Sequence, residues 1–195
     1  KIKLQKELSL DSVDARKLFQ TYHGKVPFVK QLSYALSDFA TDEGLLFTLG
    51  DRFCRFNKWE TNDKKWNNDK QRFDEVPLYN NKEQAMDAYK LEQMKKYKEL
   101  TDPECEFFDK HYTRAFTYKA LNRLIQGSAA DMTKKAMVDL YEKGVIPHIQ
   151  IHDELCFSTT DHESKMIKET MEQTIPLEVK NKVDYESGPN WGSIK

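Results

Sequence analysis

Apolar residues recur with two different spacings along the chain, and these spacings predict where helices and strands lie. Helix-spaced apolar positions follow Asp11 and again follow Pro27, and the second run stops at Gly44, which predicts two helices near the start of the chain. In residues 45–56 the apolar positions recur with a shorter period on either side of a Gly50–Asp51 turn. This change predicts two short strands joined as a hairpin.

Residues 57–113 differ in character from the segments on either side. Lys, Asn and Asp dominate residues 62–70, which predicts an exposed loop, and one amphipathic helix is predicted from about residue 82 to residue 100. The segment has no evident catalytic combination of side chains, and we interpret its charge as a solvated face. It is therefore predicted to be an excursion from the core.

A long helix is predicted from Ala115 to Tyr141, with a stop at Gly144. It contains the sequence Q-G-S-A-A-D at residues 126–131, whose small residues indicate that something approaches the backbone closely. Packing of a second helix would explain them without any ligand. Asn122 and Gln126 are four residues apart and share a different face, where their side chains would suit the acceptors of a DNA minor groove.

The stretch from Ile149 to Phe157 predicts a tight hairpin with carboxylates at its tip. Its apolar positions alternate on both sides of His152, Asp153 and Glu154. A hairpin tip could hold carboxylates where a divalent cation can reach them, and magnesium prefers one or two carboxylates together with water and substrate phosphates. A polar turn without any ligand is the alternative interpretation.

The last elements complete a mixed fold. A helix is predicted to be capped by Asp161 and to run through Gln173, and an alternating strand is predicted from Pro176 through Tyr185. The order helix, hairpin, helix, strand predicts an α+β domain in which helices pack on a small antiparallel sheet.

The composition indicates which partners and which cellular compartment to expect. Charged residues make up 32% of 195 positions but the net charge is only -1, so overall charge does not indicate a polyanionic partner, although basic residues can still gather on one face. The three cysteines have neither a zinc spacing nor a disulfide pattern, which suits a reducing, cytoplasmic compartment. No apolar run is long enough to span a bilayer, so no membrane is expected. Because the chain begins at Lys1, we expect a fragment, a processed product or a piece of a larger protein.

Several motifs, in order, resemble the C-terminal part of the family A DNA polymerases. The sequence A-L-N-R-L-I-Q-G-S-A-A-D at residues 120–131 is similar to the family's helix between fingers and palm, and I-H-D-E at residues 151–154 is similar to its third polymerase motif. The turn T-L-G-D-R at residues 48–52 and the ending G-P-N-W fall in the family's order. The sequence R-F-C-R-F-N-K-W-E at residues 52–60, before a long excursion, most resembles bacteriophage members.

The resemblance implies roles for single residues. Asp153 corresponds to the metal-binding aspartate of the palm, Glu154 to its acidic neighbour, and His152 to a histidine at the primer terminus. Gln126 and Asn122 correspond to residues that hold the minor groove of the primer–template. Tyr118 stands where many bacterial relatives have an arginine, with Lys119 and Arg114 nearby, which leaves open which cation takes over the DNA contact. Arg123 and Arg52 are further candidate DNA-binding residues. Arg52 lies among aromatic residues, an arrangement that can grip a nucleic-acid backbone but is equally typical of a solvated hairpin.

The resemblance also implies a division of the chain. Residues 1–56 would be fingers-derived helices and a hairpin, residues 57–113 a charged insertion with one helix, and residues 114–195 the C-terminal palm with the metal-binding hairpin. The family's first motif and nucleotide-binding fingers helix do not precede Asp11. We therefore expect a two-metal Mg²⁺ site that is completed by a carboxylate outside this chain, and a partner chain or N-terminal portion that supplies it.

The expected activity is DNA-directed DNA polymerisation, a nucleotidyl transfer from deoxynucleoside triphosphates to a primer, with the 195-residue chain inactive when alone. Two other classes stay open on the sequence. One is a non-catalytic module that binds primer–template DNA, and the other is a metal-dependent nuclease built on the acidic hairpin. If the chain is of phage origin, its compartment would be the host cytoplasm.

Overall fold

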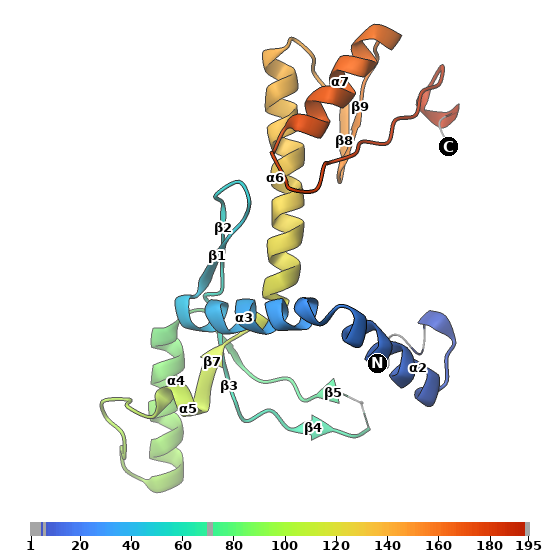
Figure 1. Ribbon diagram of the computed structural model, residues 1–195. Helices are drawn as coiled ribbons and strands as arrows, with labels where there is room; N and C mark the ends of the chain where they lie inside the picture. Colours follow the sequence, from blue (N-terminus) through green and yellow to red (C-terminus); the bar gives the residue numbers. More distant parts are fainter. Residues whose placement is uncertain (1–4, 6, 70–71, 194–195) are drawn as a thin grey trace. The chain divides into compact units, whose positions relative to one another are not determined.

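Two helices form the N-terminal part of the molecule, and both begin where the sequence predicts. In the computed structural model, which describes residues 5, 7–69 and 72–193, α2 spans Ser12–Lys25 and α3 spans Pro27–Glu43 (Figure 1). The Asp11 carboxylate accepts hydrogen bonds from two backbone N–H groups of the first turn of α2. Gly44 ends α3 with a φ of 75°, a left-handed conformation that favours glycine.

The predicted hairpin after α3 is confirmed. Strand β1, Leu45–Phe47, pairs with β2, Phe53–Arg55, and the Gly50–Asp51 turn lies between them. A small buried cluster lies at the start of this hairpin. It consists of Ala40, Leu46, Phe56 and Ala120.

Residues 59–114 form a subdomain with its own sheet and core. A three-stranded sheet has β3, Trp59–Thr61, at its centre, between β6, Leu78–Tyr79, and β7, Tyr112–Arg114. The predicted helix is α4, Lys82–Tyr97, and the short α5 spans Phe108–His111. The core is mostly aromatic and consists of Trp59, Ala85, Tyr89, Cys105, Phe108 and Tyr112.

The predicted exposed loop at residues 62–70 is only partly a loop. Strand β4, Trp66–Asn67, pairs with β5, Arg72–Phe73, and the rings of Trp66 and Phe73 meet edge to face with centroids 5.1 Å apart. A pair of aromatic side chains across two strands stabilises a short hairpin even where polar residues surround it. This contact was not evident from composition, because lysine, asparagine and aspartate dominate the segment.

We predict that the subdomain can be removed without unfolding its neighbours, because its two ends are already joined. Thr61 and Tyr112 are directly paired in the antiparallel β3–β7 ladder. Replacing residues 62–111 by Asn-Gly would convert the ladder into a two-residue hairpin. Hydrogen exchange of α3 should change by less than about threefold, as for two folding units that open independently.

A larger deletion provides the control for this prediction. Removing residues 57–116 also removes Arg114, which donates hydrogen bonds to the carbonyls of Thr41 and Phe56. Exchange at the C-terminal end of α3 should then increase. Equal loss of protection in both variants would contradict independent folding of the subdomain.

The long helix begins later than predicted. Helix α6 spans Ala120–Glu142, whereas the sequence placed its start at Ala115. Phe116 has a φ of 66°, and a 3₁₀ turn, η1, covers Thr117–Lys119. A left-handed residue cannot continue an α-helix, so the preceding segment turns toward the sheet instead, where the Ala115 N–H donates to the carbonyl of Lys58 at 2.7 Å.

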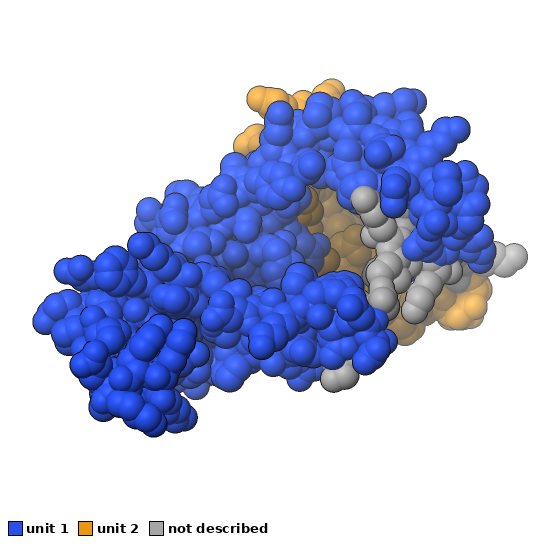
Figure 2. All heavy atoms as spheres, turned by 90° about the horizontal axis from the view of Figure 1, so that it is seen from below, with its two compact units in different colours: residues 1–46, 53–123 blue, residues 47–52, 124–195 orange. Residues whose placement is uncertain are grey.

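The chain divides into two compact units, residues 1–46 with 53–123 and residues 47–52 with 124–195 (Figure 2). The second unit contains the hairpin of β8, Ile149–Ile151, and β9, Glu154–Cys156, followed by α7, Asp161–Gln173. Helix α7 is capped by Thr160, not by the predicted Asp161, through a capping box with Glu163. It lies beside the C-terminal part of α6 (Figure 1), and the Lys143 ammonium donates to the Thr170 hydroxyl at 2.7 Å.

The strand predicted from Pro176 through Tyr185 is absent; apart from the short 3₁₀ turn η2, Trp191–Ser193, the described residues after α7 have no regular structure. A strand needs a neighbour, and β8 and β9 pair only with each other among the described residues. The Val183 N–H donates instead to the Glu172 carboxylate at 3.0 Å. The mixed α+β class predicted from the sequence is confirmed. None of the described helices has the length and apolarity needed to cross a membrane.

Candidate active site

The β8–β9 hairpin presents its polar tip to solvent, as predicted. Ile149 pairs with Cys156 and Ile151 pairs with Glu154, which leaves only His152 and Asp153 to make the turn. His152 adopts a φ of 54°, and its carbonyl accepts a hydrogen bond from the Gln150 side chain at 3.1 Å. A two-residue connection commonly requires a positive φ, so the turn fixes where the neighbouring side chains emerge.

The carboxylates at the hairpin tip are available to coordinate a metal ion. Asp153 and Glu154 are both exposed, and neither forms an ion pair with any residue in the described part of the chain. Carboxylate oxygen is the donor that Mg²⁺ prefers. Within the described ranges, no group of three or more His, Cys, Asp or Glu side chains could hold a metal ion. The donors therefore fit magnesium in kind, but this hairpin supplies only part of a coordination shell.

The polar face of α6 is exposed where the sequence placed it. Asn122 and Gln126 lie four residues apart within the helix and both are solvent-exposed. Neither amide is used in a hydrogen bond to the part of the protein that the structure describes. Both side chains can therefore donate to an external acceptor.

A turn at residues 48–52 packs against α6 within the second unit, and it explains part of the Q-G-S-A-A-D sequence. The Leu49 N–H donates to the Ser128 hydroxyl at 3.0 Å, and the Gly50 N–H donates to Asp131 Oδ2 at 3.0 Å. Arg52 forms an ion pair with Asp131 and donates through Nη2 to the carbonyl of Gly127 at 3.1 Å. The element that approaches this backbone is thus a turn, whereas the sequence also suggested a second helix.

Asp131 is the buried centre of this contact. Its side chain is 6% exposed, and a Cβ added at Gly50 would lie 2.9 Å from the Asp131 Cβ. Burial by itself raises the pKa of Asp131, but the polar groups of Thr48, Arg52 and the Gly50 N–H together outweigh it, so the pKa lies below its usual value. The sequence did not single out Asp131; the available signal is an aspartate in α6 together with an arginine just after a Gly-Asp turn.

The other candidate DNA-binding cations differ in how many contacts they already make within the protein. Arg114 lies over the Trp59 ring and donates to Thr41 O at 3.0 Å and Phe56 O at 3.2 Å, which satisfies the end of α3. Arg123 lies over the Phe56 ring and donates to the carbonyl of Arg55 at 3.2 Å. Lys119 is exposed. A DNA contact by any of these residues stays a prediction.

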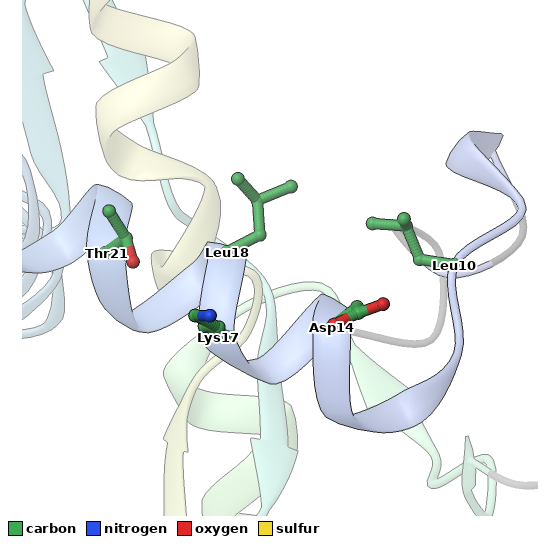
Figure 3. A pocket seen from close by; sticks show the side chains of 5 residues that line it. All are labelled: Leu10, Asp14, Lys17, Leu18 and Thr21. Carbon is green, nitrogen blue, oxygen red and sulfur yellow. The ribbon is translucent and has the colours of Figure 1, made fainter.

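The pocket that lies over α2 is not formed by the predicted site residues. A shallow pocket of about 320 Å³ lies over α2, lined by Leu10, Asp14, Lys17, Leu18 and Thr21 (Figure 3). None of the residues predicted from the sequence to act in catalysis or DNA binding lines it. The structure instead brings His152, Asp153 and Glu154 together at one hairpin tip, and it brings Arg52 to the side of α6.

Comparison with known proteins gives a consistent assignment. The model of DNA polymerase family A matches residues 1–193. A DNA-directed DNA polymerase of Pseudomonas phage M6 is 34% identical over 180 residues, which cover 92% of this chain and 20% of that protein. DNA polymerase I of Bacillus subtilis is 44% identical over 86 residues, which cover 39% of this chain and 10% of that protein. The chain thus spans about a fifth or less of the length of these relatives.

A solved structure shares the fold. The polymerase domain of Pol1 from M. smegmatis, in complex with DNA primer-template and dNTP, matches 91% of this chain and 25% of its own length, with a TM-score of 0.54 and 20% identity. At that identity the likeness concerns the fold alone. The bacteriophage resemblance seen in the sequence is supported by the Pseudomonas phage relative. The match of the family model over nearly the whole sequence establishes that the chain belongs to DNA polymerase family A.

Proposed function

We propose that this chain is the C-terminal portion of a DNA-directed DNA polymerase that adds deoxynucleotides to the 3′ end of a primer. The observation that carries the proposal is the β8–β9 tip, where Asp153 and Glu154 are exposed and unpaired among the described residues of a chain of this family. Exposed carboxylates are also common in polar turns, and the match to the family is what makes these two candidate metal ligands.

The chemistry assigned to the tip is phosphoryl transfer. Bound magnesium would stabilise the charge that develops on the attacking and leaving oxygens. Asp153 would hold the metal directly, Glu154 would assist it, and His152 would contact the primer terminus from the same turn. Two carboxylates on one hairpin cannot surround a two-metal site, so further ligands would come from another part of the polymerase.

DNA would be held mainly through its shape. The exposed amides of Asn122 and Gln126 can donate to the minor-groove acceptors that purines and pyrimidines share. Lys119 is free to contact a phosphate, while Arg52, Arg114 and Arg123 each already donate to a backbone carbonyl. We therefore assign these three arginines both a structural role and a DNA contact made by their remaining N–H groups.

The two-stranded β8–β9 sheet, with its edges unpaired in the described part of the chain, supports the need for a further portion of the polymerase. The two-stranded β8–β9 sheet has no third strand among the described residues, and a lone hairpin is marginally stable in water. Apolar side chains of the same unit are exposed, including Ile146, Ile149 and Val179. We propose that an N-terminal portion covers this surface and supplies the remaining carboxylate.

The test is reconstitution. We expect the 195-residue chain alone to aggregate and to show no magnesium-dependent primer extension, whereas the chain joined to or mixed with its N-terminal portion should extend a primer. Permanent complexes commonly bury roughly 2,000 Å² or more, so the two parts should co-elute in gel filtration. An active, monodisperse monomer of this chain alone would contradict the proposal. Stable primer–template binding by the complete protein without extension would favour a DNA-binding module.

A second expectation concerns Gln126. Gln126→Ala removes a minor-groove donor, so extension should fall roughly tenfold for all four nucleotides alike, and further from a mismatched primer end. The measurement is single-nucleotide incorporation on matched and mismatched primers. Lys134→Ala, an exposed change on the same helix, provides the control. An effect confined to one template base would remove the shape-reading role from Gln126.

A further inference from the structure

The C-terminal end of α4 is an exposed surface that the proposed polymerase chemistry does not use. Its buried side is anchored by Tyr89 and Gln93, whereas residues 94–98 are exposed. Gln93 accepts hydrogen bonds from the Asp102 N–H at 2.7 Å and the Thr101 hydroxyl at 2.8 Å. The helix end is therefore held rigidly by the subdomain core while its outer residues face solvent.

Positive charge gathers at this helix end. Residues 90–98 contain four lysines and a single acidic residue, Glu92. In the described part of the chain, Lys95, Lys96 and Lys98 form no ion pair, although Asp63 and Glu92 act on Lys96 electrostatically, whereas Lys135, Lys168 and Lys182 each have a carboxylate partner. Charge that remains uncompensated within a protein is available to an external anion.

An aromatic ring lies among these lysines. Tyr97 is 52% exposed, and the Lys96 ammonium lies 5.0 Å from the centre of its ring. Lys95 and Lys96 are rotated by about 100° from each other around the helix, and Lys98 follows the helix as its left-handed C-cap, so the three lysines do not share one helix face. The three lysines therefore fit phosphates spaced along a nucleic-acid strand better than they fit a flat acidic protein surface. An exposed tyrosine beside them can stack on an unpaired base.

We propose that the end of α4, residues 90–98, binds single-stranded DNA, with the lysines on phosphates and Tyr97 on a base. The inference rests on the proposed polymerase function and adds to it a contact with the unpaired template strand. Duplex DNA shares the phosphates, but its stacked bases offer no face to Tyr97. The surface belongs to the subdomain at residues 59–114, whose core and sheet hold α4 in place.

The experiment compares two charge-matched variants of the complete polymerase. The first is Lys95→Gln, Lys96→Gln and Lys98→Gln together; the control is Lys135→Gln, Lys168→Gln and Lys182→Gln, which removes the same charge from paired lysines. Binding to labelled oligo-dT and to a blunt duplex is measured from 50 to 200 mM salt. Each phosphate contact contributes about 0.7 to the salt slope on a single strand, so the first variant should lower it by roughly 2 and the control should not.

Tyr97→Ala tests stacking separately and should weaken oligo-dT binding roughly five- to 100-fold while leaving the salt slope unchanged. An unchanged slope in the first variant, or an equal change in the control, would overturn the proposal. Equal weakening on the blunt duplex would overturn the assignment to single strands. Failure of the wild-type protein to extend a primer would instead contradict the proposed function, so the two failures are distinguishable.

Discussion

Replacing Asp153 with asparagine in the complete polymerase is expected to reduce nucleotide incorporation roughly 1,000-fold or more. In the proposed site the substitution removes a charged oxygen ligand whose metal would stabilise transition-state charge by several kcal/mol, and each 1.4 kcal/mol corresponds to a factor of ten in rate. Folding should be unaffected, since the Asp153 side chain is exposed and forms no ion pair among the described residues. The measurement is single-turnover incorporation at saturating magnesium, alongside primer–template affinity.

Two variants provide the comparison. Glu154→Gln changes the adjacent carboxylate and should have a smaller effect, because its assigned role is to assist. Asp184→Asn changes a carboxylate that is 91% exposed and paired only with Lys182, and it should leave incorporation unchanged. Near-normal incorporation by Asp153→Asn would remove the metal-ligand role from this residue.

The second large effect is expected at Asp131. Asp131→Asn removes the charge that holds Arg52 and weakens the acceptor for the Gly50 N–H. A hydrogen bond to a charged group contributes about 2 kcal/mol, and Arg52, being half exposed, regains solvent when the pair is lost. Hydrogen exchange at the Gly50 amide should therefore become roughly 30-fold faster, with DNA extension reduced through the displaced turn.

The same pair predicts a pH dependence. The pKa of Asp131 is lowered in the folded protein, so the carboxylate stabilises the fold above its unfolded pKa of about 4, and this stability is lost as pH falls through the lower folded pKa. The stability difference between wild type and Asp131→Asn should be constant above about pH 5 and should shrink below about pH 4. A difference that persists unchanged to pH 2 would contradict this account.

Most elements could be predicted because local signals agreed with the fold. Asp11, Pro27 and Gly44 set the ends of two helices, and the alternation around His152 set the hairpin. The same pattern placed the candidate metal ligands at the hairpin tip. The roles assigned to them, however, came from the resemblance to a family rather than from the pattern itself.

The features that the sequence did not predict depend on contacts between residues far apart in the chain or on an unusual backbone conformation. Residues 176–185 have the alternating pattern of a strand but form none, and pairing partners cannot be deduced from alternation alone. The late start of α6 depends on Phe116 in a left-handed conformation, which nothing in its residue type favours. The Arg52–Asp131 pair joins residues 79 positions apart, so no short-range pattern could reveal it.

The contact between Gly44 and Arg114 constrains how this family can vary. A Cβ at residue 44 would lie 2.5 Å from the Arg114 Cζ, and the φ of 75° disfavours other residues there independently. A larger residue at position 44 therefore displaces the guanidinium that donates to the carbonyl of Thr41 in the last turn of α3 and to the carbonyl of Phe56. Substitution at position 44 should consequently be accompanied by a smaller side chain at position 114, so the two sites are expected to covary across homologues although 70 residues separate them.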